Sequence, residues 1–207
     1  MDNGTWLRDR AAVVGIGHTR YGKRGEHAHR GHLSLVVEAV KAACDDAGIS
    51  PKDIDGWASY SNDPTDAGQL QMAFGTERVR FTAMGWGGGG GAMGGAFMYA
   101  AMAVASGQAN CVAVTRGIIQ AGAGRFGGTA RAVPRYPGLQ TPGQSFALAA
   151  TRHMHMYGTK VEHFAEVAIN ARLMAANNPE ARFRTPITFE DHQSSRSIDR
   201  KSTRLNS

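Results

Sequence analysis

Eight of the eleven residues from Gly85 to Gly95 are glycine, in the stretch GWGGGGGAMGG. Backbone without side chains lets a ligand approach main-chain N–H groups closely, and N–H groups at the start of a helix bind phosphate or a developing oxyanion. No cysteine, serine or threonine occurs between Ala83 and Tyr99. The stretch therefore offers hydrogen-bond donors for a negatively charged oxygen but no nucleophile.

Three interpretations of this glycine stretch remain open from the residues alone. The order strand, glycines, helix is that of a dinucleotide site, but the next strand ends in Thr115 and Arg116, where an acid would hold the ribose. Arg116 suits a 2′-phosphate, so an NADP-dependent reductase is one alternative. The second is a site for a thioester or its oxyanion at the N-terminus of a buried helix. The third is close packing of helix on sheet, with no ligand.

The elements around the glycines alternate between strand and helix patterns. Apolar residues spaced three and four apart predict helices, and short apolar or alternating runs predict strands. Seven elements follow in order: a buried strand at 11–19, a helix at 32–47, a strand at 57–61, a helix at 66–74, a strand at 78–84, a helix at 92–106 and a strand at 111–115. This alternation predicts an α/β fold with a largely parallel sheet.

The helix at 92–106 carries no charge, so we expect it to be buried on all sides. After it, residues 117–143 are rich in glycine and proline and predict a long loop, followed by helices at 144–157 and 160–177. We therefore divide the chain into an α/β domain at 1–116 and a loop-domain segment at 117–198. Residues 199–207 read DRKSTRLNS, which back-translates onto a common sequencing-library adaptor, so we expect this tail to be non-native.

Composition excludes several classes of function. The formal charge of +6 comes from scattered basic residues, which argues against nucleic acid as a partner. No apolar segment reaches the roughly 20 residues that a membrane span needs. Cys44 and Cys111 have no partner motif, which indicates a reducing cytoplasmic setting, and both are more typical of small core residues than of nucleophiles. His27, His29 and His32 cluster in a charged stretch that we expect to be a solvated loop, so no metal site is predicted.

Several phrases of the chain resemble the thiolase superfamily, of the sterol carrier protein X and lipid-transfer-protein type. They cover nearly all of residues 11–198 and include AVVGIGHTRYGK at 12–23, EAVKAACDDAGISPKDIDG at 38–56, AMAVASGQANCVAV at 101–114, RHMHMYGT at 152–159 and AANNPEARFRTPIT at 175–188. The resemblance implies the N-terminal half of a thiolase-like layered αβαβα fold. It also implies an acyl-CoA enzyme of lipid or steroid metabolism, such as an acetyl-CoA acetyltransferase or a lipid-transfer protein.

In the thiolase pattern a nucleophilic cysteine stands at the start of the buried helix, a position that falls at Gly90 in this chain. A cysteine-free branch, the thiolase-like aldolases of steroid side-chain degradation, is more similar: its arginine-led loop resembles RGIIQAGAGRFG at 116–127. That resemblance implies retro-aldol cleavage of a β-hydroxyacyl-CoA, with a coenzyme A thioester as substrate and no covalently bound cofactor. Gly91 is the expected oxyanion N–H, and Tyr99 is a further catalytic candidate.

Arg116, Arg125 and Tyr136 are candidates for substrate binding because they lie at or in the long loop. The resemblance implies a homodimer and a small acyl-CoA-binding partner of zinc-ribbon and OB-fold type. It also places the acid/base tyrosines beyond this chain, so we expect the 207-residue chain alone to be inactive. The alternative from another class is a non-catalytic acyl-CoA or lipid carrier.

Overall fold

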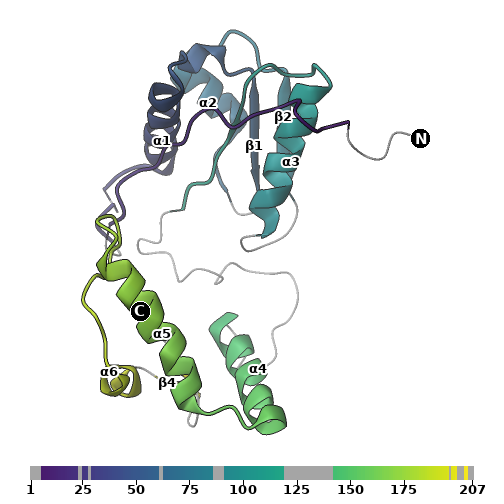
Figure 1. Ribbon diagram of the computed structural model, residues 1–207. Helices are drawn as coiled ribbons and strands as arrows, with labels where there is room; N and C mark the ends of the chain where they lie inside the picture. Colours follow the sequence, from purple (N-terminus) through teal and green to yellow (C-terminus); the bar gives the residue numbers. More distant parts are fainter. Residues whose placement is uncertain are drawn as a thin grey trace. The chain divides into compact units, whose positions relative to one another are not determined.

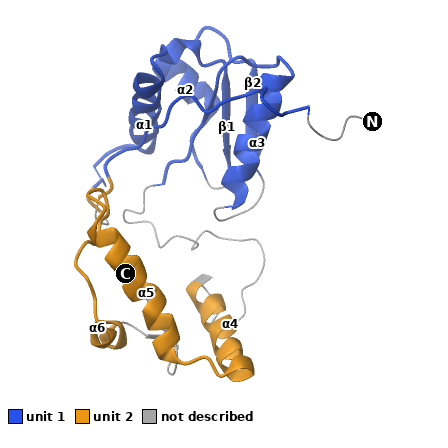
Figure 2. Cartoon of the chain, in the orientation of Figure 1, with its two compact units in different colours: residues 1–20, 27–119 blue, residues 21–26, 120–207 orange. Residues whose placement is uncertain are grey.

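The computed structural model describes residues 6–22, 25–27, 29–60, 63–85, 91–118, 142–195, 197–199 and 203–204 (Figure 1). The chain separates into two compact units (Figure 2). Unit 1 comprises Met1–Arg20 and His27–Ile119, and unit 2 comprises Tyr21–Glu26 and Gln120–Ser207. In the described part of the chain, no helix combines the length and apolarity that crossing a membrane requires.

A parallel sheet forms the centre of unit 1, as the alternating pattern predicts. Among the described residues it has three strands: β1 (Gly56–Tyr60) lies between β2 (Phe81–Gly85) and β3 (Val112–Val114) and is parallel to both. The register pairs the last residues of β1 and β2, Tyr60 and Gly85. The carboxyl ends of all three strands therefore meet at one edge of the sheet, where open α/β sheets bind ligands.

Helices cover both faces of this sheet (Figure 1). On one face, α1 (His32–Ala47) and α2 (Ala67–Phe74) enclose an apolar core of Val36, Val40, Cys44, Ile54, Trp57 and Leu70. On the other face, α3 (Gly91–Ala105) packs alanines against β1. Because successive side chains of a strand point to opposite faces, Trp57 belongs to the first core and Ala58 to the second. The α/β class is confirmed.

The ends of the first two helices follow from their local sequence. Gly48 ends α1 and Gly75 ends α2, both in the left-handed conformation, with φ of 68° and 64°. Asp66 begins α2: its side chain accepts a hydrogen bond from Gly68 N at 2.6 Å, and the Gln69 side chain accepts one from Asp66 N. These helices lie within a residue of their predicted limits.

The buried strand predicted at 11–19 is wrong. These residues are all described and none of them pairs in a sheet, and Val14 and Ile16 are 64% and 74% exposed. The segment instead runs along α1, where Asp46 accepts a hydrogen bond from Ile16 N at 2.9 Å. An apolar run becomes a strand only where a neighbouring strand supplies hydrogen bonds, and none of the described residues does so here.

Gly17 allows this segment to approach α1. A Cβ atom at residue 17 would lie 2.2 Å from the Ala39 carbonyl oxygen and 2.3 Å from the Ala43 nitrogen. We therefore expect Gly17→Ala to lower the free energy of unfolding by about 1–3 kcal/mol, since rigid backbone atoms must move. Gly94→Ala, in open space within α3, is the control and should stabilise by about 0.5 kcal/mol. Urea titration measures the free energy of unfolding of both variants. Equal changes in the two would contradict the close approach of Gly17 to α1.

The expectation that the uncharged third helix is buried all round is also wrong. Its alanines Ala96, Ala100 and Ala103 are buried, but Phe97, Met98 and Met102 are 40–51% exposed. A helix on one face of a sheet buries only the side chains that point to the sheet, whatever its composition. Among the described residues, nothing covers the outer side of α3 enough to bury these three.

Unit 2 is mostly helical, as predicted for residues 144–157 and 160–177. Its elements are α4 (Pro142–Tyr157), α5 (Val161–Ala176), α6 (Phe189–Ser194), and the short antiparallel strands β4 (Ser197–Asp199) and β5 (Thr203–Arg204). Phe183 follows α5, and the guanidinium carbons of Arg172, within α5, and of Arg182 lie 5.2 and 4.7 Å from its ring centre. Arg172 also donates to the Thr185 carbonyl oxygen at 3.1 Å.

Candidate active site

The start of α3 lies at the carboxyl edge of the sheet. A Cβ atom on Gly85, the last residue of β2, would be 3.2 Å from the Ala92 carbonyl oxygen and 3.4 Å from Tyr60 Cβ. The first turn of α3, the end of β2 and the end of β1 are therefore in contact. The free N–H groups of a helix's first turn carry partial positive charge, so this edge favours a negatively charged oxygen.

Arg116 lies at the same edge, two residues after β3. Its guanidinium carbon is 4.4 Å from the ring centre of Tyr60, and its Nη1 donates to the Tyr60 carbonyl oxygen at 3.3 Å. Arg116 Nε is buried and has no hydrogen-bond partner among the described residues. Tyr60 thus contacts the Arg116 guanidinium group through both its ring and its carbonyl oxygen.

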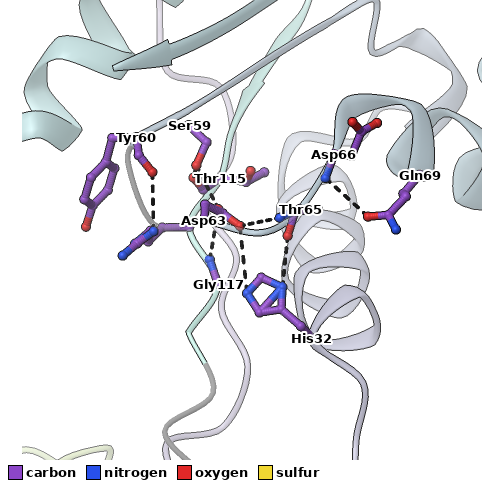
Figure 3. Close-up of polar contacts among 10 residues, drawn as sticks. His32, Ser59, Tyr60, Asp63, Thr65, Asp66, Gln69, Thr115 and Gly117 are labelled. Atoms are coloured by element: carbon purple, nitrogen blue, oxygen red, sulfur yellow. Dashed lines mark hydrogen bonds and ion pairs between the residues drawn. The ribbon is translucent and has the colours of Figure 1, made fainter. Parts of the chain in front are cut away.

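A buried carboxylate, that of Asp63, organises the chain beside Arg116 (Figure 3). Its Oδ2 accepts hydrogen bonds from Ser59 Oγ at 2.8 Å and Gly117 N at 3.3 Å, and its Oδ1 accepts one from Thr65 N at 3.0 Å. His32 Nε2 lies 3.8 Å from Oδ1. These contacts join the segments after β1 and β3 to the first turn of α1.

His32 is therefore not the solvated loop residue that its charged surroundings predict. It is the first residue of α1, its side chain is 20% exposed, and its Nδ1 lies 3.0 Å from Thr65 Oγ1. The prediction is wrong because the segment after β1 packs against the first turn of α1, which places Asp63 and Thr65 beside the imidazole. Among the described residues, no three His, Cys, Asp or Glu side chains are placed to hold a metal ion.

The structure places two of the residues predicted for the site at the same edge of the sheet. Gly91 begins α3 and Arg116 follows β3, both at the carboxyl edge. Tyr99 lies eight residues into α3, about 12 Å along the helix axis from Gly91. Gly90, Arg125 and Tyr136 lie outside the described residues, so their predicted roles stay predictions.

Sequence reasoning missed Tyr60, Ser59 and Asp63. One signal was available: polar residues at the end of a predicted strand and just after it lie at the ligand-binding edge of a parallel sheet. Ser59 and Tyr60 are in the predicted strand at 57–61, and Asp63 is two residues after it. The partners of Asp63 could not be predicted, because His32 and Gly117 are distant in sequence and meet it only in the folded chain.

The two cysteines lie away from this edge and have unreactive surroundings. Burial raises the pKa of the Cys44 thiol, and the nearby carboxylates of Asp45 and Asp53 raise it further. Burial also raises the pKa of Cys111, with smaller contributions from the Cys44 thiol and the carboxylates of Asp55 and Asp53. The thiolate is the reactive form, so neither cysteine is suited to nucleophilic attack near neutral pH.

We expect these cysteines to react slowly with iodoacetamide. At pH 8.5 a free thiol is about half ionised, whereas a raised pKa leaves Cys44 and Cys111 less ionised, so their alkylation should be slower than that of a free thiol. The rate should rise as the pH rises, because more of each thiol becomes thiolate. The chain unfolded in urea is the control and should react at the rate of free cysteine. Equal rates for the folded and unfolded chains would show that the thiols are not shielded.

The chain is similar to several known proteins. No family model matches the chain. It is 40% identical over 203 residues to a steroid side-chain-cleaving aldolase of Thermomonospora curvata, covering 91% of this chain and 51% of that protein. It is 37% identical over 206 residues to the 17-hydroxy-3-oxo-4-pregnene-20-carboxyl-CoA lyase of Mycobacterium tuberculosis, covering 93% and 52%. A shorter match of 55 residues, at 38% identity, is to sterol carrier protein 2 of Oryctolagus cuniculus, covering 27% of this chain and 10% of that protein.

The fold is also that of a solved structure. The Ltp2-ChsH2(DUF35) aldolase superposes with a TM-score of 0.79 at 35% identity, covering 95% of this chain and 51% of that one. The resemblance to sterol carrier proteins and steroid-cleaving aldolases is thereby confirmed. The chain spans about half the length of these two curated aldolase and lyase relatives. Over that length, it is a homologue of the aldolases that cleave steroid side chains.

Proposed function

We propose that this protein cleaves a carbon–carbon bond of a 3-hydroxyacyl-CoA thioester by retro-aldol chemistry, with a steroid side chain as the acyl group. One combination carries the proposal: the chain resembles two C–C-cleaving enzymes at 40% and 37% identity, and residues 83–99 around the start of α3 include no cysteine, serine or threonine. A thiolase-type acyltransferase needs such a nucleophile to form its acyl-enzyme. Retro-aldol cleavage does not.

The name of the Mycobacterium tuberculosis relative indicates where the bond breaks in its own substrate. A hydroxyl on carbon 17 is β to a thioester carbonyl carried on carbon 20. In a retro-aldol step the β-hydroxyl loses its proton and becomes a carbonyl. The bond between the α and β carbons breaks, and its electron pair passes to the thioester as an enolate. Protonation of the α carbon then releases a short acyl-CoA and a ketone or aldehyde.

Within this chain, we assign the enolate oxygen to the N–H groups at the start of α3, with Gly91 as the residue of the first turn nearest to it. Preorganised N–H donors at a developing oxyanion are a large part of catalysis by such sites. We assign Arg116 to the same negative charge or to a phosphate of coenzyme A. Support comes from its place beside Tyr60 at the shared edge and from its unpartnered, buried Nε.

We also propose a protein partner of the DUF35 type, with a zinc-ribbon and OB-fold architecture. The superposed structure is named for its aldolase together with ChsH2(DUF35). A partner that holds the acyl-CoA would complement a site whose described residues supply positive potential through Arg116 and the first turn of α3.

The test is a product assay on the complete gene product that contains this chain, together with a DUF35-type partner. A 3-hydroxyacyl-CoA with a steroid acyl group is supplied, and the products are separated by mass spectrometry. We expect a shortened acyl-CoA and a steroid ketone in equal amounts. Tight acyl-CoA binding without either product would reject cleavage in favour of a carrier. Transfer of an acyl group to free coenzyme A would instead identify an acyltransferase.

A further inference from the structure

Two carboxylates join β1 to the β3 segment, one at each end of the strand. At the amino end, the Asp55 carboxylate accepts hydrogen bonds from Asn110 N at 2.9 Å and Cys111 N at 2.9 Å. At the carboxyl end, the Asp63 carboxylate accepts from Gly117 N. The two contacts are alike in chemistry but lie at opposite edges of the sheet. Only the Asp63 contact is next to the candidate site.

The Asp63 carboxylate is fully buried, with a side-chain exposure of 0%. A buried charge is costly unless hydrogen bonds and opposite charge compensate it. Here hydrogen bonds from Ser59 Oγ, Thr65 N and Gly117 N compensate it, and the His32 imidazole lies 3.8 Å away (Figure 3). Because these groups come from α1 and from the segments of both β1 and β3, the carboxylate sets their separation at this edge.

Gly117 is confined on its other side by α1. A Cβ atom at residue 117 would lie 2.5 Å from Val36 Cγ2 and 2.8 Å from the His32 ring. The main chain at Gly117 is thus held between the Asp63 carboxylate and the first turns of α1. Arg116 is the preceding residue, so its Cα position is set by the same contacts, and its guanidinium group is then directed to Tyr60.

We propose that Asp63 is a positioning residue, which acts on the reaction through Arg116 by fixing the main chain at Gly117. This inference rests on the proposed function for its catalytic consequence. The contact itself is a property of the fold and has its own measurement. Asp55 makes the equivalent contact at the far edge and has no such consequence.

The catalytic consequence is tested by a double-mutant cycle in the complete gene product. Asp63→Asn should lower kcat/KM for C–C cleavage about 30-fold. A displacement of the Arg116 guanidinium group by ~1 Å from its contact with the substrate has effects of this size. In the Arg116→Met background the same substitution should change kcat/KM by less than about 2-fold, because the guanidinium group that Asp63 positions is no longer present. Asp55→Asn is the matched control: it should lower the urea midpoint while leaving kcat/KM within about 2-fold. If Asp63→Asn lowered kcat/KM by the same factor in the wild-type and Arg116→Met backgrounds, the proposal would be overturned.

The contact is tested without any activity, by amide hydrogen exchange of the 207-residue chain. Asp63→Asn should speed exchange at Gly117 N–H at least about 10-fold, and Asp55→Asn should not. Unchanged exchange at Gly117 would refute the positioning contact even if the protein cleaves its substrate. Faster exchange in a protein that cleaves nothing would support the contact and reject the proposed function. Gly117→Ala, which forces the main chain away from Val36, serves if Asp63→Asn does not fold, with the same loss of kcat/KM expected.

Discussion

Arg116→Met is expected to lower kcat/KM for acyl-CoA cleavage about 100-fold, because it removes a fixed positive charge from the place where the proposed retro-aldol step develops negative charge. Arg116 is held by Tyr60, through the ring face at 4.4 Å and the carbonyl oxygen at 3.3 Å, so little reorganisation is needed as the charge forms. Arg116→Lys should lower kcat/KM less, about 10-fold, since lysine keeps the charge but lacks the planar group that stacks on the Tyr60 ring. Steady-state kinetics on the complete gene product measures both.

Arg80→Met is the control for Arg116→Met. Arg80 belongs to the same unit, but it donates to the Gly107 carbonyl oxygen at 2.9 Å and pairs with Asp55 at the amino edge of the sheet. Its removal should leave kcat/KM within about 2-fold, as for a partly exposed ion pair away from the site. Equal losses of kcat/KM from Arg80→Met and Arg116→Met would show that Arg116 has no specific role in the site.

Asp63→Ala is expected to give the largest loss of stability, lowering the free energy of unfolding by about 3–5 kcal/mol. The substitution leaves the N–H groups of Gly117 and Thr65 without their acceptor in a buried place, and each such group costs about 1–3 kcal/mol. Ser59 Oγ keeps an acceptor, because the Thr115 carbonyl oxygen also lies 2.8 Å from it. Urea titration followed by circular dichroism measures the loss.

Asp55→Ala provides the comparison for this prediction. It leaves the N–H groups of Asn110 and Cys111 without their acceptor, but the Asp55 side chain is 14% exposed, so water can replace part of the lost hydrogen bonding. We expect Asp55→Ala to lower the free energy of unfolding by about 1–2 kcal/mol. A smaller loss for Asp63→Ala than for Asp55→Ala would mean that the buried carboxylate contributes little to the fold.

Local sequence signals predict most elements of this fold. Apolar spacing predicts α1, α2 and α3, and glycines at 48 and 75 mark two helix ends, because these features depend on residues within a few positions of one another. The failures are tertiary. Residues 11–19 have the composition of a buried strand but no strand beside them among the described residues. The uncharged α3 leaves Phe97, Met98 and Met102 exposed because nothing described covers its outer side.

The features of the site divide in the same way, into those that local sequence signals predict and those that depend on tertiary contacts. The positions of Gly91 and Arg116 at the sheet edge could be predicted, since Gly91 begins an element with a clear pattern and Arg116 lies two residues after one. The contact of Arg116 with Tyr60 and the pairing of Tyr60 with Gly85 cannot be derived from one segment alone. The Asp63 cluster joins residues far apart in the sequence, from His32 to Gly117, so only the folded chain reveals it.

The most direct test of the account is the mass of the intact protein during turnover of a 3-hydroxyacyl-CoA. Residues 83–99 include no cysteine, serine or threonine, and burial raises the pKa of Cys44 and Cys111. The account therefore predicts that the shortened acyl-CoA accumulates while the protein keeps its unmodified mass, even when the reaction is quenched at early times. An acyl group on the protein that forms and decays at the rate of turnover would contradict it.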